Sequence, residues 1–225
     1  MQETLHKSRG LSRPAGTPIA DETPSRRLPT ALPPISTEPR PTHQFALRDE
    51  GDTDRLGRIL AAGLRVGSVV GLNGDLGAGK TRLVRAVALA AGVAPEEIGS
   101  PTFTLVREYA TDFTAAFSPD DAASAAGESA PPRPPVLFHL DAYRLTDEDD
   151  YLNLGPEEFV EAGAVLIEWA ERVEDVLPAD RLTLTLAATG ETSRAVTLTA
   201  GGPDARRLRD AVLSEFSPAA ARNDR

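Results

Sequence analysis

The stretch GDLGAGKT, residues 74–81, decides the fold of this 225-residue chain. It matches every fixed position of the pattern G-x-x-x-x-G-K-[ST]. Glycines let such a loop curl with its N–H groups facing inward, and the start of a following helix adds partial positive charge. A loop of this kind binds the phosphates of a nucleoside triphosphate, with Lys80 at the β- and γ-phosphates and the Thr81 hydroxyl on Mg²⁺.

The segments on either side of this loop have the character that the pattern requires. Residues 68–72 (SVVGL) form an apolar run typical of a short buried strand. Residues 80–91 (KTRLVRAVALAA) repeat apolar side chains at helical spacing, so we predict a helix that starts at Lys80. Because a strand precedes the loop and a helix follows it, an ordinary glycine-rich turn explains the match poorly.

Further helices are predicted by their boundary residues. Asp52-Thr53 offers an N-cap for a helix that closes at Gly63, and Asp204 offers one for a last helix. Residues 156–162 (PEEFVEA) have proline at the first position, acidic residues in the first turn and glycine after the end. The acidic run at residues 147–150 is most simply a solvated turn.

Strands are predicted at residues 103–109, 136–140 and 164–167. Two alternating segments, residues 181–186 and 194–199, flank Gly190 and predict an antiparallel hairpin. Together with the strand before the loop, they indicate a single α/β domain of the P-loop NTPase kind. Its mixed β-sheet is expected to be flanked by helices.

Proline content predicts where this domain begins and ends. Eight of the 19 prolines lie in residues 1–42 and five more lie in residues 110–135, and both stretches lack periodic apolar residues. We therefore predict a disordered N-terminal extension over 1–42 and a flexible loop insertion over 110–135. The P-loop domain is expected to span 43–216, with a disordered tail at 217–225.

Charge and composition exclude several classes of protein. The chain has no cysteine, which excludes disulfides and thiolate metal sites. It has neither an apolar run of the roughly 18 residues that a membrane span needs nor the apolar stretch of a secretory signal, so we expect a cytoplasmic protein. The net charge is −10, and residues 1–42 contribute +2, so the remaining 183 residues carry −12. A body this acidic repels nucleic acid backbones, so any role in RNA metabolism is expected to act through a partner.

Two carboxylates follow predicted strands, as a P-loop site requires for holding Mg²⁺ or its waters. Asp141 comes after VLFHL and Glu168 after AVLI, so both should emerge at the sheet edge where the loop lies. His139 is interpreted as a buried, hydrogen-bonded histidine rather than a catalytic base. Trp169 is interpreted mainly as core packing, with an aromatic wall beside the nucleotide or a partner as the alternative.

Four segments together resemble one family. They are GDLGAGKT (74–81), SPTFTLVREY (100–109), HLDAYRL (139–145) and IEWAER (167–172). The chain is similar, over about residues 45–199, to the TsaE family, formerly YjeE. These are small P-loop ATPases of bacterial tRNA N6-threonylcarbamoyladenosine (t6A) synthesis. The N-terminal extension and the insertion have no counterpart in the compact family pattern.

The resemblance implies a site and a role. The loop residues Leu76, Gly77, Ala78, Gly79, Lys80 and Thr81 would wrap the phosphates of ATP. Thr81 and Glu168 would be the Mg²⁺ ligands, and Asp141 would be a second essential carboxylate that positions water or the γ-phosphate. Thr102 would sense the γ-phosphate, and Glu50 would lie on the adenine side. The ATPase would act on a complex of the TsaD and TsaB proteins, with tRNA reached only through that complex.

Other P-loop classes fit less well. A small-molecule kinase stays as the alternative, although only Arg107 and Arg144 look placed to close over donor phosphates, and the insertion has a single Arg133. A GTP-driven switch would need an N-K-x-D motif, and none of the three asparagines is followed by lysine. An ABC-type transport ATPase is disfavoured because the L-S-G-G-Q signature is absent.

Overall fold

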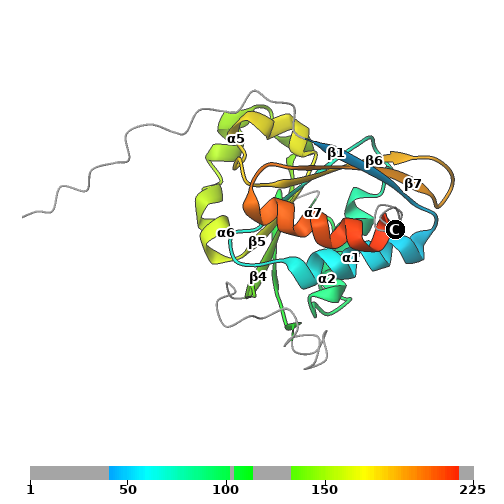
Figure 1. Ribbon diagram of the computed structural model, residues 1–225. Helices are drawn as coiled ribbons and strands as arrows, with labels where there is room; N and C mark the ends of the chain where they lie inside the picture. The colour runs from blue at the N-terminus through cyan, green and yellow to red at the C-terminus, as the bar shows by residue number, and fades with distance from the viewer. Residues whose placement is uncertain (1–40, 102–103, 114–132, 218–225) are drawn as a thin grey trace, which may run out of the picture. The chain divides into compact units, whose positions relative to one another are not determined.

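Seven strands form one sheet in the computed structural model, which describes residues 41–101, 104–113 and 133–217 (Figure 1). The strands are β1 (Thr42–Leu47), β2 (Val69–Asn73), β3 (Val106–Ala110), β4 (Val136–Asp141), β5 (Ala164–Glu168), β6 (Leu182–Ala188) and β7 (Arg194–Ala200). The helices are α1 (Glu50–Gly63), α2 (Lys80–Ala90), α5 (Glu148–Leu152), α6 (Pro156–Ala162) and α7 (Pro203–Phe216). Two 3₁₀ segments, η1 (Ala142–Arg144) and η2 (Ala170–Val176), complete the described part.

The strand order β1-β7-β6-β2-β5-β4-β3 places the P-loop strand β2 at the centre of the sheet. Strands β6, β2, β5 and β4 are parallel, whereas β7, β1 and β3 run antiparallel to their neighbours. The predicted mixed sheet flanked by helices is therefore confirmed. Because the central strands are parallel, their carboxyl ends meet at one edge, where ligands bind in open α/β sheets.

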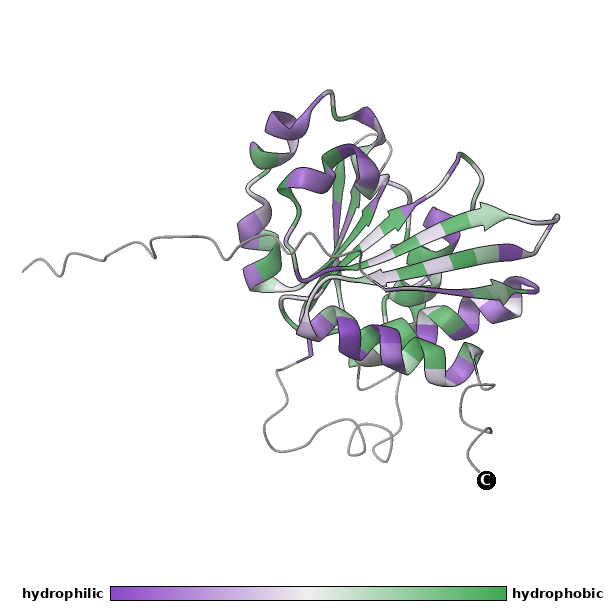
Figure 2. Ribbon diagram, turned by 45° about the horizontal axis from the view of Figure 1, so that its top comes forward, coloured by the Kyte–Doolittle hydropathy of each residue, from purple (hydrophilic) through white to green (hydrophobic). Residues whose placement is uncertain are grey.

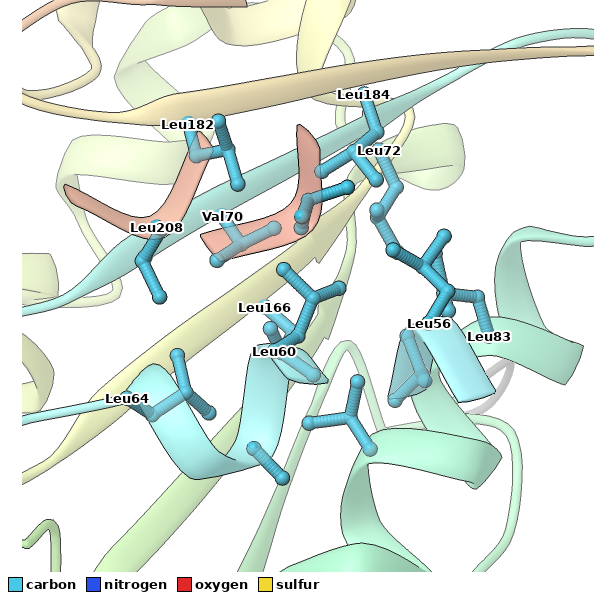
Figure 3. Packing of buried hydrophobic residues seen from close by; sticks show 14 of the residues in the cluster. Leu56, Leu60, Leu64, Val70, Leu72, Leu83, Leu166, Leu182, Leu184 and Leu208 are labelled. Atoms are coloured by element: carbon cyan, nitrogen blue, oxygen red, sulfur yellow. The ribbon is translucent and has the colours of Figure 1, made fainter. Parts of the chain in front are cut away.

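Each face of the sheet has its own core. On one face, leucines of α1, α2 and α7 pack against β2, β5 and β6, and Figure 3 shows Leu60 of α1 and Leu208 of α7 gathered around Val70 of β2. On the other face, Val165 and Ile167 of β5 pack against α5, η1 and η2. Burial of each large aliphatic side chain contributes about 1.5–3 kcal/mol. Figure 2 shows that α7 turns its hydrophilic residues away from the sheet.

The predicted caps of the first and last helices are wrong. Helix α1 begins at Glu50, with Asp49 as N-cap, because the Asp52 carboxylate is taken by Arg48, whose Nε lies 2.7 Å from Oδ2. Helix α7 begins after Gly202, and Asp204 lies within its first turn. The carboxylate of Asp180, 24 positions earlier, accepts hydrogen bonds from the Asp204 and Ala205 N–H groups instead.

Three further elements differ from the sequence-based expectation. The acidic run is a helix start rather than a turn, because Asp147 caps α5 by accepting from Asp150 N, and the helix buries Tyr151. Strand β3 begins only at Val106, since Thr104 N and Leu105 N both donate to Pro101 O at 2.9 Å in a turn. Edge strand β1, which pairs with β7, was not predicted.

The predicted extension, insertion and tail stay predictions. Residues 1–40, 114–132 and 218–225 lie outside the described residues. The first described strand begins at Thr42 and the last helix ends at Phe216. Among the described helices, none has both the length and the apolar character needed to cross a membrane.

The start of α1 yields a pH-dependent stability prediction. Hydrogen bonds from the Arg48 side chain and backbone lower the pKa of Asp52 from 3.8 to about 2. A carboxyl group with a lowered pKa stabilises the fold above its unfolded pKa, and that contribution is lost as the pH falls through the folded pKa. Since Arg48 is largely exposed, we expect Asp52→Asn to lower the free energy of unfolding by only about 1 kcal/mol near neutral pH.

Urea unfolding measured near neutral pH and again at about pH 2 checks this expectation, because most of the difference should be lost at the lower pH. Asp210→Asn is the matched control, since Asp210 is exposed and pairs only with its neighbour Arg209 among the described residues. An equal loss at both pH values would contradict the assignment.

Candidate nucleotide-phosphate site

The loop between β2 and α2 has the curled backbone that phosphate binding requires. Gly74, Gly77 and Gly79 have φ angles of 129°, 80° and 105°, in the region that favours glycine. Gly79 caps α2 without any side-chain hydrogen bond, so the first N–H groups of this 11-residue helix face the loop. These N–H groups and the helix dipole form an anion site at the carboxyl end of β2.

Lys80 lies inside this loop. Its side chain is buried, and Nζ donates to the carbonyl oxygens of Gly74 at 2.5 Å and Asp75 at 3.0 Å. Desolvation lowers the pKa of Lys80, while nearby carboxylates, first Glu168, oppose that shift. The ammonium group is thus held by neutral carbonyls at the place where phosphate oxygens are expected.

Trp169 forms a wall beside this lysine. Lys80 Nζ lies 3.6 Å from the centroid of the indole ring, a cation–π contact, and Tyr143 packs on the ring with 5.0 Å between centroids. Trp169 also packs against the core on the α5 side of the sheet. The core-packing interpretation is therefore confirmed, whereas an aromatic wall beside the nucleotide stays a prediction. The contact with the P-loop lysine could not be read from the sequence.

Glu168 is the buried acid of the site. Its Oε2 accepts a hydrogen bond from Thr81 Oγ1 at 2.8 Å, and its Oε1 lies 2.8 Å from His139 Nε2. The side chain is only 4 % exposed, and that of His139 only 1 %. The end of β5 is thus joined both to the start of α2 and to the middle of β4.

Asp141 lies beside Glu168 in the register of β4 and β5. Its Oδ1 accepts from Tyr143 N at 3.0 Å, which caps η1. The structure therefore brings Lys80, Thr81, Asp141 and Glu168 to one edge of the sheet, with the Asp141 carboxylate partly engaged by its own chain.

Glu50 lines a small hollow beside Gly79. The hollow measures about 60 Å³ and is lined by residues of the start of α1, the start of α2 and the β6–β7 turn, namely Glu50, Thr53, Gly79, Arg82, Leu186, Glu191, Thr192 and Arg194. The side chain of Glu50 is 70 % exposed. It thus lies next to the loop, and its expected place on the adenine side stays a prediction.

Arg194 is a site residue that sequence reasoning missed. At the start of β7, its Nε donates to Ala78 O at 2.7 Å, and its Nη1 donates to Ser193 O at 2.8 Å. It therefore fastens the β6–β7 turn to the phosphate loop. No local sequence pattern indicates this role, because the contact joins residues 116 positions apart.

The predicted γ-phosphate sensor cannot be placed, since Thr102 lies outside the described residues. Its neighbours are anchored on either side. Ser100 O accepts from Arg107 Nε at 3.1 Å, and Pro101 O accepts from Leu105 N.

The oxygen donors present fit Mg²⁺ held jointly with a nucleotide. Within the described residues, no group of three or more His, Cys, Asp or Glu side chains could hold a metal. Mg²⁺ prefers hard oxygen ligands and is usually held by one or two protein groups together with phosphates and waters. The Thr81 hydroxyl and the Glu168 carboxylate, 2.8 Å apart at the loop, are such a pair.

The parallel central strands, the GDLGAGKT loop and the lysine inside it define a P-loop nucleotide-binding protein. Within that class the chain belongs to the TsaE family, because the family model described as "Threonylcarbamoyl adenosine biosynthesis protein TsaE" matches residues 47–196. The resemblance seen in the sequence is therefore confirmed.

Curated relatives and a solved structure agree with this membership. The tRNA threonylcarbamoyladenosine biosynthesis protein TsaE of Treponema pallidum is 36% identical over 152 residues, which cover 67% of this chain and 96% of the relative. The protein of the same name from Bacillus subtilis is 34% identical over 151 residues, which cover 67% of this chain and 81% of the relative. The crystal structure of YdiB from Bacillus subtilis superposes with a TM-score of 0.54 at 26% identity, covering 79% of this chain and 98% of YdiB.

Two loop glycines provide a matched test of this geometry. A Cβ at Gly74 would lie 2.2 Å from Leu186 O, whereas a Cβ at Gly77 would meet nothing within 4 Å. Both positions have positive φ, which costs an L-residue about 1–2 kcal/mol. We expect Gly77→Ala to lower the free energy of unfolding by about 1 kcal/mol, and Gly74→Ala by about 3 kcal/mol or more, because β6 must move. Urea unfolding of the two variants measures the difference. Equal losses of unfolding free energy would mean that Leu186 of β6 is not in close contact with Gly74.

Proposed function

We propose that this protein is the ATP-binding and ATP-hydrolysing subunit required for t6A modification at position 37 of tRNA, with Mg²⁺ as cofactor. The observation that carries the proposal is the hydrogen bond from Thr81 to the buried Glu168, set beside Lys80 in the P-loop. This is the arrangement through which P-loop NTPases hold a nucleotide and its metal. Family membership supports the role in t6A biosynthesis.

Each site residue has a role in this proposal. The backbone N–H groups of residues 76–81 bind the phosphates, and the Lys80 ammonium neutralises the β- and γ-phosphates. Thr81 Oγ1 and the Glu168 carboxylate hold Mg²⁺, which when bound neutralises charge that develops on the transferred phosphoryl group.

Asp141 is the residue proposed to orient the attacking water. Its Oδ1 is fixed by Tyr143 N, and its Oδ2 makes no hydrogen bond with the described residues, so this oxygen is available to accept one from water. Thr102 is proposed as the γ-phosphate sensor and Glu50 as a residue on the adenine side, next to the hollow at Gly79.

The proposed partners are the TsaD and TsaB proteins, in the cytoplasm. The 183 residues after the extension carry −12, which disfavours direct binding of an RNA backbone. We therefore propose that tRNA is reached only through the TsaD–TsaB complex and that hydrolysis drives turnover of that complex.

A small-molecule kinase is less well supported, because two of the three arginines considered for it are engaged elsewhere. Arg107 donates to the Ser100 carbonyl. Arg133 donates to the carbonyls of Ala61 and Ala62, at the opposite end of α1 from Glu50. A 14-residue helix is about 20 Å long, so this arginine is far from the loop.

Removal of each of the two carboxylates is expected to affect a different property of the site. Glu168→Ala should raise the Mg²⁺ concentration for half-maximal ATP binding by about tenfold or more, because it removes a metal ligand. Asp141→Ala should leave binding nearly unchanged and lower kcat about 100-fold, because it acts only on the attacking water. Lys80→Ala should weaken ATP binding with or without the metal.

Fluorescent ATP titration and steady-state hydrolysis separate these effects. Glu161→Ala, an exposed carboxylate of α6, is the matched control and should change neither quantity. If the Asp141 and Glu168 phenotypes were exchanged, the two roles would be exchanged as well.

Partner dependence is tested by measuring ATP hydrolysis by the purified protein alone, with the TsaD–TsaB pair, and with the pair plus tRNA. We expect slow hydrolysis alone and stimulation by the pair. If the protein bound ATP but did not associate with TsaD–TsaB, the proposed role would be abandoned and the nucleotide site retained. Stoichiometric ADP release with a phosphorylated small molecule would favour the kinase.

A further inference from the structure

His139 is buried at the centre of the sheet and points at the metal-side carboxylate. Its ring is 1 % exposed, and Nε2 lies 2.8 Å from Oε1 of Glu168. The other oxygen of the same carboxylate, Oε2, accepts from Thr81 Oγ1 at 2.8 Å. Each oxygen of Glu168 therefore has one fixed partner, and the two partners come from different elements, β4 and α2.

The surroundings determine which ring nitrogen carries the hydrogen. A carboxylate only accepts hydrogen bonds, so the 2.8 Å contact requires Nε2–H as donor. Nδ1 is buried and has no hydrogen-bond partner in the described part of the chain, as expected for a bare acceptor nitrogen in the neutral ring. A buried acceptor without a partner is tolerated better than a buried N–H group without one.

The sheet makes this contact rigid. In the parallel register of β4 and β5, His139 is opposite Leu166 and Asp141 is opposite Glu168, so the backbones of donor and acceptor are locked by the ladder. Tyr109 of β3 packs beside the imidazole, with 6.3 Å between ring centroids. The Tyr109 hydroxyl is itself anchored by donating to Gly99 O at 2.7 Å. The imidazole therefore has a fixed place from which to orient the carboxylate.

We infer that His139 is a positioning residue for Mg²⁺ binding: its Nε2–H holds Oε1 of Glu168, so that Oε2 stays at Thr81 where the metal is to be bound. The inference rests on the proposed nucleotide function and extends it to a residue that touches neither nucleotide nor metal. Hydrogen-bond partners that orient a metal ligand typically change metal affinity 10–100-fold when removed. A histidine that merely filled the core would affect folding and leave the metal dependence unchanged.

Two amide variants test the inference. In His139→Gln the side-chain N–H₂ can reach the position of Nε2, whereas in His139→Asn it is one methylene too short. Trp169 is the only tryptophan of the chain and lies 3.6 Å from Lys80 Nζ, so its fluorescence reports nucleotide binding without any turnover. ATP is titrated with EDTA present, and Mg²⁺ is then titrated at saturating ATP, for wild type, both variants and Glu168→Ala.

We expect His139→Asn to raise the Mg²⁺ concentration for half-maximal response about tenfold, with the affinity for metal-free ATP within about twofold of wild type. His139→Gln should lie within about threefold of wild type in both titrations. Thermal unfolding shows whether each variant is folded. If the Asn variant does not fold, a tenfold change in the Mg²⁺ dependence of a folded Gln variant still overturns the inference.

Other outcomes are equally decisive. If the Asn variant bound metal-free ATP as much more weakly as it bound ATP with Mg²⁺, His139 would be a structural residue only. The same conclusion would follow if the variant matched wild type in both titrations. A wild-type protein that bound no ATP would instead remove the proposed function. Loss of Mg²⁺ dependence in Glu168→Ala but not in His139→Asn would keep that function and reject the inference.

Discussion

A hydrogen bond of 2.8 Å between Thr81 and Glu168 joins the first turn of α2 to the last residue of β5, and the site depends on it. Glu168 is almost fully buried, and a buried carboxylate is stable only when its oxygens are hydrogen-bonded or paired. Thr81 and His139 supply those bonds from two different elements. The helix, the central strands and the acidic residue are therefore fixed relative to each other.

The same requirement explains the position of Lys80. Its ammonium group is partly desolvated, which is unfavourable for a cation, and it is balanced by two carbonyls, the face of Trp169 and the charge of Glu168. A phosphate group could replace the carbonyls with stronger, charge-assisted bonds. The loop is thus held in a conformation with a cation inside it, while the glycines keep its backbone curled.

Much of this arrangement was predictable because it is local in the sequence. The loop, β2, α2 and α6 follow from glycine, proline and apolar spacing within windows of about ten residues. Asp141 and Glu168 were found because parallel strands end at one edge. One miss was local: Arg48 takes the carboxylate of Asp52, four residues further on. The others depend on contacts between distant residues: Asp180 caps α7, and Arg194 holds the loop at Ala78. Side-chain spacing carries no signal for such contacts. His139 was correctly interpreted as buried, but its acceptor could not be named.

The last helix has a consequence for the synthesis of the chain. Ser68, directly before β2, donates to Asp204 in the first turn of α7 at 2.7 Å, and β2 pairs with β6, which begins at Leu182. The strand that carries the phosphate loop therefore lacks one neighbour and one anchor until residues near 204 have left the ribosome. The loop at residues 74–81 is therefore synthesised well before the segments that hold its strand in place.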